Sequence, residues 1–325
     1  MLLLTRDDVI KVLDMPDCIE AVEKAFAELA SGTAVLPLRI GITPPDGIAL
    51  YMPAYLKEAG ALACKVVTVY KNNPAKYNMP TTIGKVLIQD PKTGDVICIM
   101  DGGYLTAVRT GAVSGVSTKY LARQDKGQKV GIFGAGVQGK AQLWAMAVTR
   151  DIARAYVYDS IETAIPKFVE EMSAKLDLEV VKASSPEQIL EEADIICTTT
   201  TSPTPLFDGS KVREGTHING IGSHTPNARE LDTALIKRAR VVADSYEACL
   251  KEAGDIIIPI NEGAIDKSHM YAELGEIVTG KKLARANDKE ITLFKSNGLA
   301  IQDVATARLV YDKAVQAKIG AEVTL

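Results

Sequence analysis

Residues 129–139 read KVGIFGAGVQG, an apolar β-type run that leads directly into Gly134, Gly136 and Gly139 at the spacing G-x-G-x-x-G. At this spacing the first glycine permits a tight turn, the second lets the backbone approach a diphosphate, and the third lets a helix pack close to the strand. A helical stretch, residues 140–150, follows the glycines. The segment therefore predicts a dinucleotide-binding strand, turn and helix. Its predicted cofactor-binding residues are Gly134, Gly136, Val137, Gln138 and Gly139.

The next β-type run ends at Asp159, 20 residues after Gly139. A carboxylate at the end of this strand can accept hydrogen bonds from the ribose hydroxyls of adenosine, and it would repel the 2′-phosphate of NADP. Ser160 follows, and no arginine stands beside it. We therefore expect the cofactor to be NAD(H) in preference to NADP(H).

From residue 129 onward, apolar runs of strand character alternate with helical stretches, which is typical of βαβ units in a parallel sheet. The predicted strands are 129–133, 155–158, 179–182, 195–198, 217–221, 241–244 and 291–295. We predict an α/β fold with a Rossmann-type doubly wound parallel sheet. Because ligands bind at the carboxyl ends of such strands, Thr199, Thr200 and Gly222 are candidates to contact the nicotinamide half of the cofactor.

The segments on either side of this region indicate a second domain of α+β type. Residues 5–31 have helical periodicity, with Thr5 as a cap and Gly32 at the end. Residues 39–100 contain short β-type runs separated by turns such as PPDG and DPKTGD, which predicts an antiparallel meander.

Two further helices are predicted beside the meander, at 105–122 and at 303–317. Because the second of them comes after the last strand of the parallel sheet, it is expected to return to the first domain. The predicted domains are therefore residues 1–119 with 303–325, and a dinucleotide-binding domain at residues 120–302.

Composition excludes several classes of protein. The chain has 325 residues, 47% of them hydrophobic and 24% charged, and its net charge is −4. Such a chain is typical of a globular protein, and its balanced charge does not favour nucleic acid or an anionic membrane as a partner. No apolar run is long enough to span a bilayer, and the opening MLLLTRDD has too few apolar residues for a signal peptide. We expect a cytoplasmic protein whose five scattered cysteines are reduced, and we assign no metal ligands.

Four segments outside the glycine turn carry a resemblance to one family. They are PLR at 37–39, CKV at 64–66, AVRTGA at 107–112 and SNGLAIQDVA at 296–305. Together with the turn they resemble the ornithine cyclodeaminase/mu-crystallin family over essentially the whole chain. This combination is not shared by Rossmann proteins at large. The family contains ornithine cyclodeaminases, archaeal-type alanine dehydrogenases, reductases of cyclic ketimines such as Δ1-pyrroline-2-carboxylate, and ketimine-reducing mu-crystallins, all of them NAD(P)-dependent.

The resemblance implies a homodimer formed by the substrate-binding domains, and a substrate carboxylate held by Arg39, Lys65 and Arg109. Arginine offers a carboxylate a planar bidentate partner, and lysine can lose its proton when it is desolvated among other cations. Lys65 lies in LACKVVTVY and Arg109 in LTAVRTGAVSGV, and a charge in such apolar surroundings is normally paired or functional. The resemblance also adds to the cofactor-binding residues Ser296, Asn297 and Gly298.

The segment GSHTPNARE at 222–230 departs from the cyclodeaminase pattern. Ornithine cyclodeaminases resemble it but carry an aspartate where this sequence has His224, and that carboxylate is implicated in the deamination and ring closure of ornithine. His224 can exchange protons near neutral pH and is a candidate catalytic residue, yet it is no fixed anion for the δ-amino group. The alternative is a loop histidine bonded to the backbone. The ornithine reaction is therefore disfavoured.

The predicted function is that of an NAD(H)-dependent reductase of small α-imino acids, of the Δ1-pyrroline-2-carboxylate or ketimine type, with hydride delivered to C2. Arg39 and Arg109 would bind the substrate carboxylate, and Lys65, or a water that it polarises, would supply the proton to nitrogen. Three alternatives stay open. They are an alanine dehydrogenase, which needs the same groups and room for ammonia, an ornithine cyclodeaminase, and a mu-crystallin-like ligand-binding protein without turnover.

Overall fold

The structure, a computed structural model, describes residues 1–324 and divides into two compact units. The first unit contains Met1–Thr110 and the chain from Leu299 onward, and the second contains Gly111–Gly298. The expected second domain, residues 120–302, begins nine residues and ends four residues further along the chain than Gly111–Gly298. The domain boundaries stay a prediction.

The second unit contains eight strands and the helices that connect them. The strands are β8 (Gln128–Phe133), β9 (Ile152–Tyr158), β10 (Val180–Lys182), β11 (Ile195–Thr198), β12 (His217–Gly220), β13 (Arg240–Ala243), β14 (Met270–Glu273) and β15 (Thr292–Lys295). The helices are the second half of α4 (Gly102–Leu121), α5 (Val137–Thr149), α6 (Ile165–Leu176), α7 (Pro186–Glu192), α8 (Thr233–Arg238), α9 (Tyr246–Glu252), α10 (Gly254–Asn261) and α11 (Leu274–Val278).

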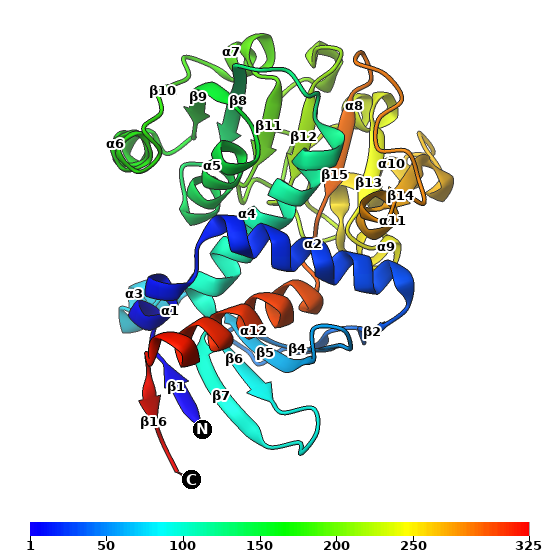
Figure 1. Ribbon diagram of the computed structural model, residues 1–325. Coiled ribbons are helices and arrows are strands. Elements are labelled where there is room, and N and C mark those ends of the chain that lie inside the picture. The colour runs from blue at the N-terminus through cyan, green and yellow to red at the C-terminus, as the bar shows by residue number, and fades with distance from the viewer. Residues whose placement is uncertain (325) are drawn as a thin grey trace. The chain divides into compact units, whose positions relative to one another are not determined.

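All strand pairs of this sheet are parallel, in the order β10-β9-β8-β11-β12-β15-β13-β14 (Figure 1). The chain builds outward from β8 in one direction and then from β11 in the other, so a topological switch point lies between these two strands. The seven predicted strands are all present, with ends that match or differ by at most three residues. The eighth, β14, was missed because four residues at the sheet edge, of which only two are buried, carry no apolar run.

Helices cover both faces of this sheet. Successive residues of a strand point to opposite faces, and β8 shows one contact on each side. A Cβ on Gly131 would meet Ile189 of α7, whereas Ile132 lies against Gly139 of α5. Phe133, on the same face as Gly131, joins Ile189 in a large apolar core. The predicted doubly wound Rossmann-type sheet is therefore confirmed.

The first unit combines a mixed sheet with a few helices. Its strands are β1 (Leu2–Leu4), β2 (Ala34–Val35), β3 (Ile40–Ile42), β4 (Ile48–Leu56), β5 (Ala61–Val69), β6 (Thr82–Gln89), β7 (Val96–Asp101) and β16 (Ala321–Glu322). Its helices are α1 (Arg6–Val12), α2 (Met15–Ser31), α3 (Asn73–Tyr77), the first half of α4, and α12 (Ala300–Ala317).

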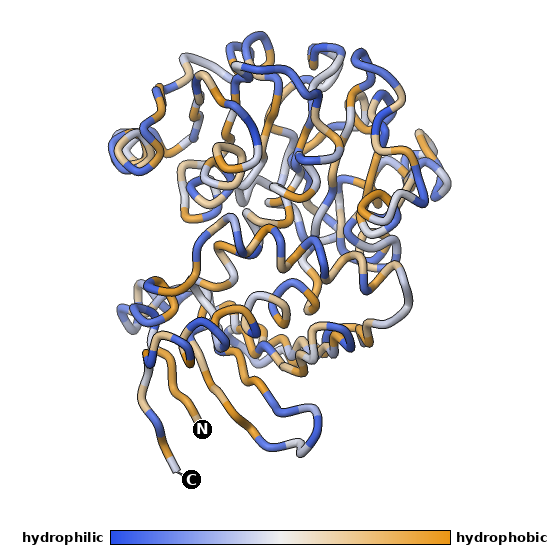
Figure 2. Tube along the Cα trace, viewed as in Figure 1, coloured by the Kyte–Doolittle hydropathy of each residue, from blue (hydrophilic) through white to orange (hydrophobic). Residues whose placement is uncertain are grey.

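Strands β4 to β7 form the predicted antiparallel meander. In Figure 2 the hairpin of β6 and β7 is mostly hydrophobic along its strands and hydrophilic at its tip, where Asp90 N donates to Asp95 O at 2.8 Å. β1, which was not predicted, pairs in parallel with β7. Helix α12 packs on α2 and on β4 and β5, so the predicted return of the last helix to this part of the chain is confirmed.

Local capping explains where the first helices begin and end. Thr5 and Asp8 form a reciprocal capping box at the start of α1. Gly32 ends α2 with φ of 75°, a left-handed conformation that glycine adopts without strain. Both predictions for these positions are confirmed.

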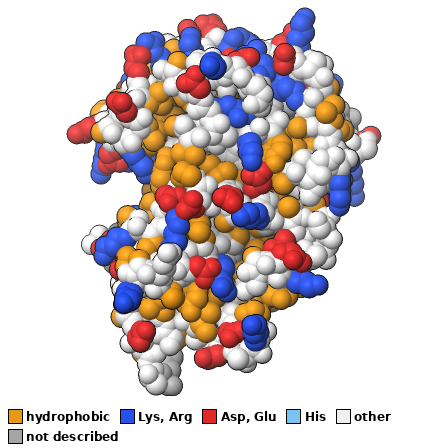
Figure 3. Space-filling view, viewed as in Figure 1, with side chains coloured by type: hydrophobic (Ala, Val, Ile, Leu, Met, Phe, Trp, Pro, Cys, Tyr) orange, Lys and Arg blue, Asp and Glu red, His pale blue; other side chains and the backbone are white. Residues whose placement is uncertain are grey.

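On the face seen in Figure 3, acidic and basic side chains are interspersed, in keeping with a net charge of −4. Within residues 1–324, none of the helices has the length and hydropathy needed to cross a membrane.

Candidate active site

The turn between β8 and α5 has the geometry that a diphosphate requires. Gly134 has φ of 106°, and a Cβ there would lie 2.7 Å from Thr199 Oγ1, so glycine alone suits this position. A Cβ on Gly139 would overlap the carbonyl oxygen of Gly134. By contrast, a Cβ on Gly136 would meet no described atom within 4 Å, so this stretch of backbone borders open space. Each glycine has the surroundings that its predicted role needs.

Helix α5 begins directly after this turn with an uncapped N-terminus. Gly136 is the N-cap residue, and no side-chain cap hydrogen bond is made at this position. Val137 is 67% exposed, and the buried Gln138 Oε1 has no hydrogen-bond partner in the described chain. Amides at the N-terminus of a helix attract anions. The turn and the start of α5 therefore fit the diphosphate of a dinucleotide.

Asp159 lies directly after β9 and beside the same turn. Its Oδ2 accepts a hydrogen bond from Ala135 N at 2.7 Å, and its Oδ1 accepts one from Ile161 N at 2.8 Å. In this fold, a carboxylate at the end of the second strand is placed to accept the ribose hydroxyls of adenosine. The structure thus brings this carboxylate next to the glycine turn, and its role in discriminating NAD from NADP stays a prediction.

The loops that follow β11 and β12 are fixed by hydrogen bonds to other parts of the second unit. Thr199 Oγ1 donates to Phe133 O at 2.9 Å, which ties the first loop to the end of β8. Thr200 donates its N–H and its hydroxyl to Glu230 Oε1, at 2.6 and 2.7 Å. Gly222 donates its N–H to Glu230 Oε2 at 2.8 Å. Two of the residues predicted beside the nicotinamide therefore bond a glutamate that sequence reasoning missed.

Ser296, Asn297 and Gly298 surround another buried carboxylate. Ser296 Oγ, Asn297 N and Gly298 N all donate to Asp244 Oδ2, at 2.9, 2.7 and 2.8 Å. Burial raises the pKa of Asp244, while the hydrogen bonds from these three residues act in the opposite direction. The segment is thus fixed to the end of β13 by an acidic residue that was not predicted.

His224 is exposed, and its Nδ1 lies 3.0 Å from Gly222 O. This contact is of the kind expected for a loop histidine bonded to the backbone. Its catalytic role stays a prediction.

In the first unit, Lys65 and Arg109 meet at one buried carboxylate. Lys65 comes from β5, Arg109 from α4 and Asp303 from α12. Lys65 Nζ lies 2.7 Å from the Asp303 carboxylate, and Arg109 Nε lies 2.9 Å from its Oδ1. The relative exposures of the three residues are 1%, 6% and 0%. Both cations are therefore paired, as charges in apolar surroundings normally are.

The pKa of Lys65 is lowered from 10.5 to about 8. Burial is the largest cause, because it disfavours the charged form, and the positive charge of Arg109 acts in the same direction. The charge and hydrogen bond of Asp303 oppose both effects. Lys65 is thus an ammonium at neutral pH that can release its proton without a strong base.

The guanidinium of Arg109 is fixed at two points. Its Nε bonds Asp303, and its Nη1 donates to Gln302 Oε1 at 2.5 Å. Gln302 is fully buried, and its amide nitrogen has no partner among the described side chains and backbone. Arg39, half-buried before β3, is near enough for its charge to lower the pKa of Lys65. The three basic residues singled out from the sequence therefore share one neighbourhood.

This cluster combines two chemical capacities. Lys65 and Arg109 carry two positive charges against the single negative charge of Asp303, so the three groups together attract a further carboxylate. The lowered pKa of Lys65 makes it a proton donor and acceptor near neutral pH.

Asp303 lies in the segment SNGLAIQDVA at 296–305, but the sequence analysis assigned it no role. A signal was available, because Asp303 lies in AIQDVATA, among mainly apolar and small residues at the start of a predicted helix. The rule that identified Lys65 and Arg109, a charge in apolar surroundings, applies equally to this carboxylate.

Comparison with known proteins identifies the family. The model of the ornithine cyclodeaminase/mu-crystallin family matches residues 1–318. A Delta(1)-pyrroline-2-carboxylate reductase of Bacillus cereus is 37% identical over 98% of this chain and 98% of its own length. The Thermococcus litoralis Delta(1)-pyrroline-2-carboxylate reductase, solved in complex with NADH and L-proline, superposes with a TM-score of 0.95 at 48% identity, covering 99% of this chain and 100% of that one. An archaeal alanine dehydrogenase dimer with bound NAD gives a TM-score of 0.94 at 35% identity, over 100% and 99% of the two chains. The chain belongs to the ornithine cyclodeaminase/mu-crystallin family.

Proposed function

We propose that this protein is an NADH-dependent reductase of small cyclic α-imino acids, with Δ1-pyrroline-2-carboxylate as the leading substrate and L-proline as its product. The observation that carries the proposal is the buried cluster of Lys65, Arg109 and Asp303, which pairs a proton donor with a receptor for a carboxylate. The Thermococcus litoralis relative, which binds NADH and L-proline, supports the choice of substrate.

Reduction of a C=N bond needs a hydride on carbon and a proton on nitrogen. NADH, when bound, supplies the hydride. The residues that would hold it are those of the glycine turn, the N-terminus of α5 and Asp159, since their geometry fits a diphosphate and a ribose. Lys65, with its pKa lowered to about 8, would donate the proton to the imine nitrogen.

The substrate carboxylate would be bound by Arg109 and Arg39. Asp303 and Gln302 hold Arg109 at Nε and at Nη1, so its guanidinium is oriented before substrate arrives. Because the cluster is buried, few water molecules compete for these charges, and each interaction with the substrate is strengthened.

NADH is proposed over NADPH because of Asp159. A carboxylate that lies beside the glycine turn would face the 2′-phosphate of NADP with like charge.

Reductive amination, the reaction of an alanine dehydrogenase, would use the same residues. Its support is the similarity to the archaeal alanine dehydrogenase at 35% identity, below the 48% of the pyrroline-2-carboxylate reductase. Ornithine cyclodeamination ranks lower, because an exposed histidine bonded to backbone, His224, stands where cyclodeaminases carry an aspartate.

We further propose that the first unit binds substrate and pairs with a second copy of the chain. The adjacent strands β3 and β4 expose Ile40, Ile42 and Tyr51, an apolar set suited to contact with another subunit. The archaeal alanine dehydrogenase is a dimer, and sedimentation of the purified protein would test this assignment. A cytoplasmic location is proposed because all five cysteines are free thiols, as is usual in a reducing compartment.

The function is tested by incubating the purified protein with NADH and Δ1-pyrroline-2-carboxylate, and in parallel with NADH, pyruvate and ammonium. Rapid loss of NADH absorbance with the cyclic imine is expected, together with formation of L-proline. Faster reaction with pyruvate and ammonium would favour the alanine dehydrogenase. NADH binding without turnover on either would favour a ligand-binding protein and contradict the proposal.

A further inference from the structure

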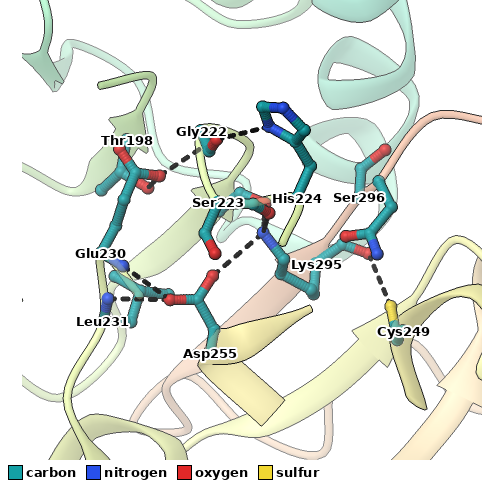
Figure 4. Close-up of polar contacts among 12 residues, drawn as sticks. Thr198, Gly222, Ser223, His224, Glu230, Leu231, Cys249, Asp255, Lys295 and Ser296 are labelled. Carbon is teal, nitrogen blue, oxygen red and sulfur yellow. Dashed lines mark hydrogen bonds and ion pairs between the residues drawn. The ribbon is translucent and has the colours of Figure 1, made fainter. Parts of the chain in front are cut away.

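Three charged side chains of the second unit form a buried cluster next to the loops that follow β11 and β12 (Figure 4). They are Glu230, Asp255 and Lys295, each with a relative exposure of 0%. Lys295 Nζ lies 3.0 Å from Asp255 Oδ2. Asp255 Oδ1 in turn accepts the backbone N–H groups of Glu230 and Leu231, at 2.8 and 3.0 Å. Asp255 therefore fixes the backbone that carries Glu230.

The carboxylate of Glu230 joins the two loops. Its Oε1 accepts both hydrogen bonds from Thr200, and its Oε2 accepts Thr198 Oγ1 and Gly222 N, each at 2.8 Å. Thr198 ends β11, Thr200 lies in the loop after it, and Gly222 lies in the loop after β12. One side chain thus bonds both loops at the carboxyl ends of β11 and β12, two strands that the sheet already pairs.

Lys295 bonds both the second loop and the end of β12. Its Nζ donates to Ser223 O at 2.6 Å and to Gly220 O at 3.1 Å. Burial acts against the charge of Lys295, but Asp255 and Glu230 outweigh it and raise the pKa. Burial and Asp255 raise the pKa of Glu230, and Lys295 opposes them. Glu230, Asp255 and Lys295 therefore form one connected charge network, in which Glu230 and Lys295 both bond the loop after β12.

We propose that Glu230 is a positioning residue for the nicotinamide half of the cofactor. It touches neither the glycine turn nor Asp159 in any described contact, and it acts on the loops at the carboxyl ends of β11 and β12, where the ligand crevice of a doubly wound sheet lies. This role rests on the proposed function, because it presumes that a nicotinamide dinucleotide binds to this sheet.

The substitution Glu230→Gln separates this role from simple stabilisation. Each carboxylate oxygen of Glu230 accepts from one hydroxyl and one backbone N–H. The hydroxyls of Thr198 and Thr200 can rotate to accept a hydrogen bond from an amide NH2, but the N–H groups of Thr200 and Gly222 cannot. Whichever way the glutamine amide is oriented, its NH2 group faces the backbone N–H of either Thr200 or Gly222, and two donors cannot bond each other.

The experiment compares the Kd of NADH with the Kd of ADP-ribose, which lacks the nicotinamide, by titration calorimetry. For Glu230→Gln we expect the Kd of NADH to rise roughly tenfold, while the Kd of ADP-ribose changes less than about twofold. Equal losses for both ligands, or no loss in a folded variant, would overturn the positioning role.

Glu28→Gln is the matched control. Glu28 is also a buried glutamate, and its carboxylate accepts the backbone N–H groups of Glu58 and Ala59, each at 3.0 Å, in the first unit. This variant is expected to lower stability but to leave both dissociation constants unchanged. A change in the NADH constant equal to that of Glu230→Gln would also overturn the proposal.

If Glu230→Gln does not fold, Thr198→Val provides the test, because it removes one of the four donors and keeps the carboxylate. We then expect the Kd of NADH to rise about threefold with ADP-ribose unaffected, and an unchanged ratio of the two constants refutes the role. A wild-type protein that binds ADP-ribose but no NADH or NAD+ would instead refute the proposed function, and the positioning role with it.

Discussion

Replacement of Asp303 by asparagine tests whether this carboxylate keeps Lys65 protonated. Asparagine has nearly the same shape as aspartate, so the variant removes the negative charge 2.7 Å from Lys65 Nζ and leaves a polar group in place. Burial and the charge of Arg109, which both lower the pKa of Lys65, then act without the opposing carboxylate. We therefore expect the pKa of Lys65 to fall well below about 8.

The loss of stability can be bounded from the same numbers. Removal of one partner of a buried ion pair typically destabilises a protein by about 3–5 kcal/mol. Lys65 can avoid an unpaired charge by losing its proton. With a pKa of about 8, deprotonation of Lys65 at pH 7 costs about 1.4 kcal/mol, so its share of the destabilisation cannot exceed this value. Arg109 cannot deprotonate, so the remainder of the destabilisation comes from its unpaired charge.

The assay is the pH profile of kcat for imine reduction at saturating NADH. In the proposed mechanism the ammonium form of Lys65 donates the proton, so wild-type kcat is expected to fall as pH rises through about 8. In Asp303→Asn this limb should move to lower pH. At a fixed pH above the pKa, the protonated fraction of Lys65 falls about tenfold when its pKa falls by about 1. Denaturant unfolding of the same samples reports the loss of stability separately.

Asp312→Asn is a suitable control, since Asp312 lies on the same helix, is exposed, and pairs with Arg308. This variant should leave the pH at which kcat falls unchanged. The reasoning about Asp303 is wrong if a folded Asp303→Asn variant keeps the wild-type limb, or if its limb moves to higher pH.

Three further outcomes are expected. Asp159→Ser should weaken the preference for NADH over NADPH, and equal kinetics with both cofactors in the wild type would contradict the role of Asp159. Arg109→Ala should raise the substrate KM about 30- to 1000-fold with little change in NADH affinity, and it should move the limb of Lys65 to higher pH because a neighbouring positive charge is lost. L-Ornithine with NAD should release little ammonia, and rapid conversion of ornithine to proline would refute the interpretation of His224.

The nucleotide-binding fold was predictable because its determinants are local. The turn has glycine at three fixed positions, two of which leave no room for a Cβ, and the predicted strands of the parallel sheet form short apolar runs. The strands that were missed are short: β1, β2, β14 and β16 contain two to four residues each, and only their pairing with a neighbouring strand defines them. Such pairing is a long-range property that periodicity does not register.

The buried acids were harder to predict because their partners are distant in sequence. Lys65 and Asp303 are 238 residues apart, and Glu230 bonds Thr198 at the end of β11 and Gly222 in the loop after β12. No spacing motif connects such groups. Thr200 and Gly222 were predicted as cofactor contacts from their place after strands, but the same place also exposes their N–H groups to an internal carboxylate.

An argument from charge balance could have identified one of these acids, Asp303, from the sequence. A buried cation is stable only when an anion or several hydrogen bonds compensate it. Once Lys65 and Arg109 were assigned to apolar segments, the chain therefore required a buried acid, and Asp303, among mainly apolar residues at the start of a predicted helix, met that requirement.

The same balance explains why a substrate with one carboxylate and no second amine suits this site. Lys65 and Arg109 share Asp303, so the three groups keep a net positive charge for the substrate carboxylate to offset. A cyclic imino acid brings that carboxylate and a nitrogen ready to be protonated. Ornithine brings an additional ammonium, and Asp303 is already engaged by two cations, so accepting a third would leave an uncompensated buried charge. The electrostatics of this cluster therefore favour reduction of a preformed ring over its formation from a diamine.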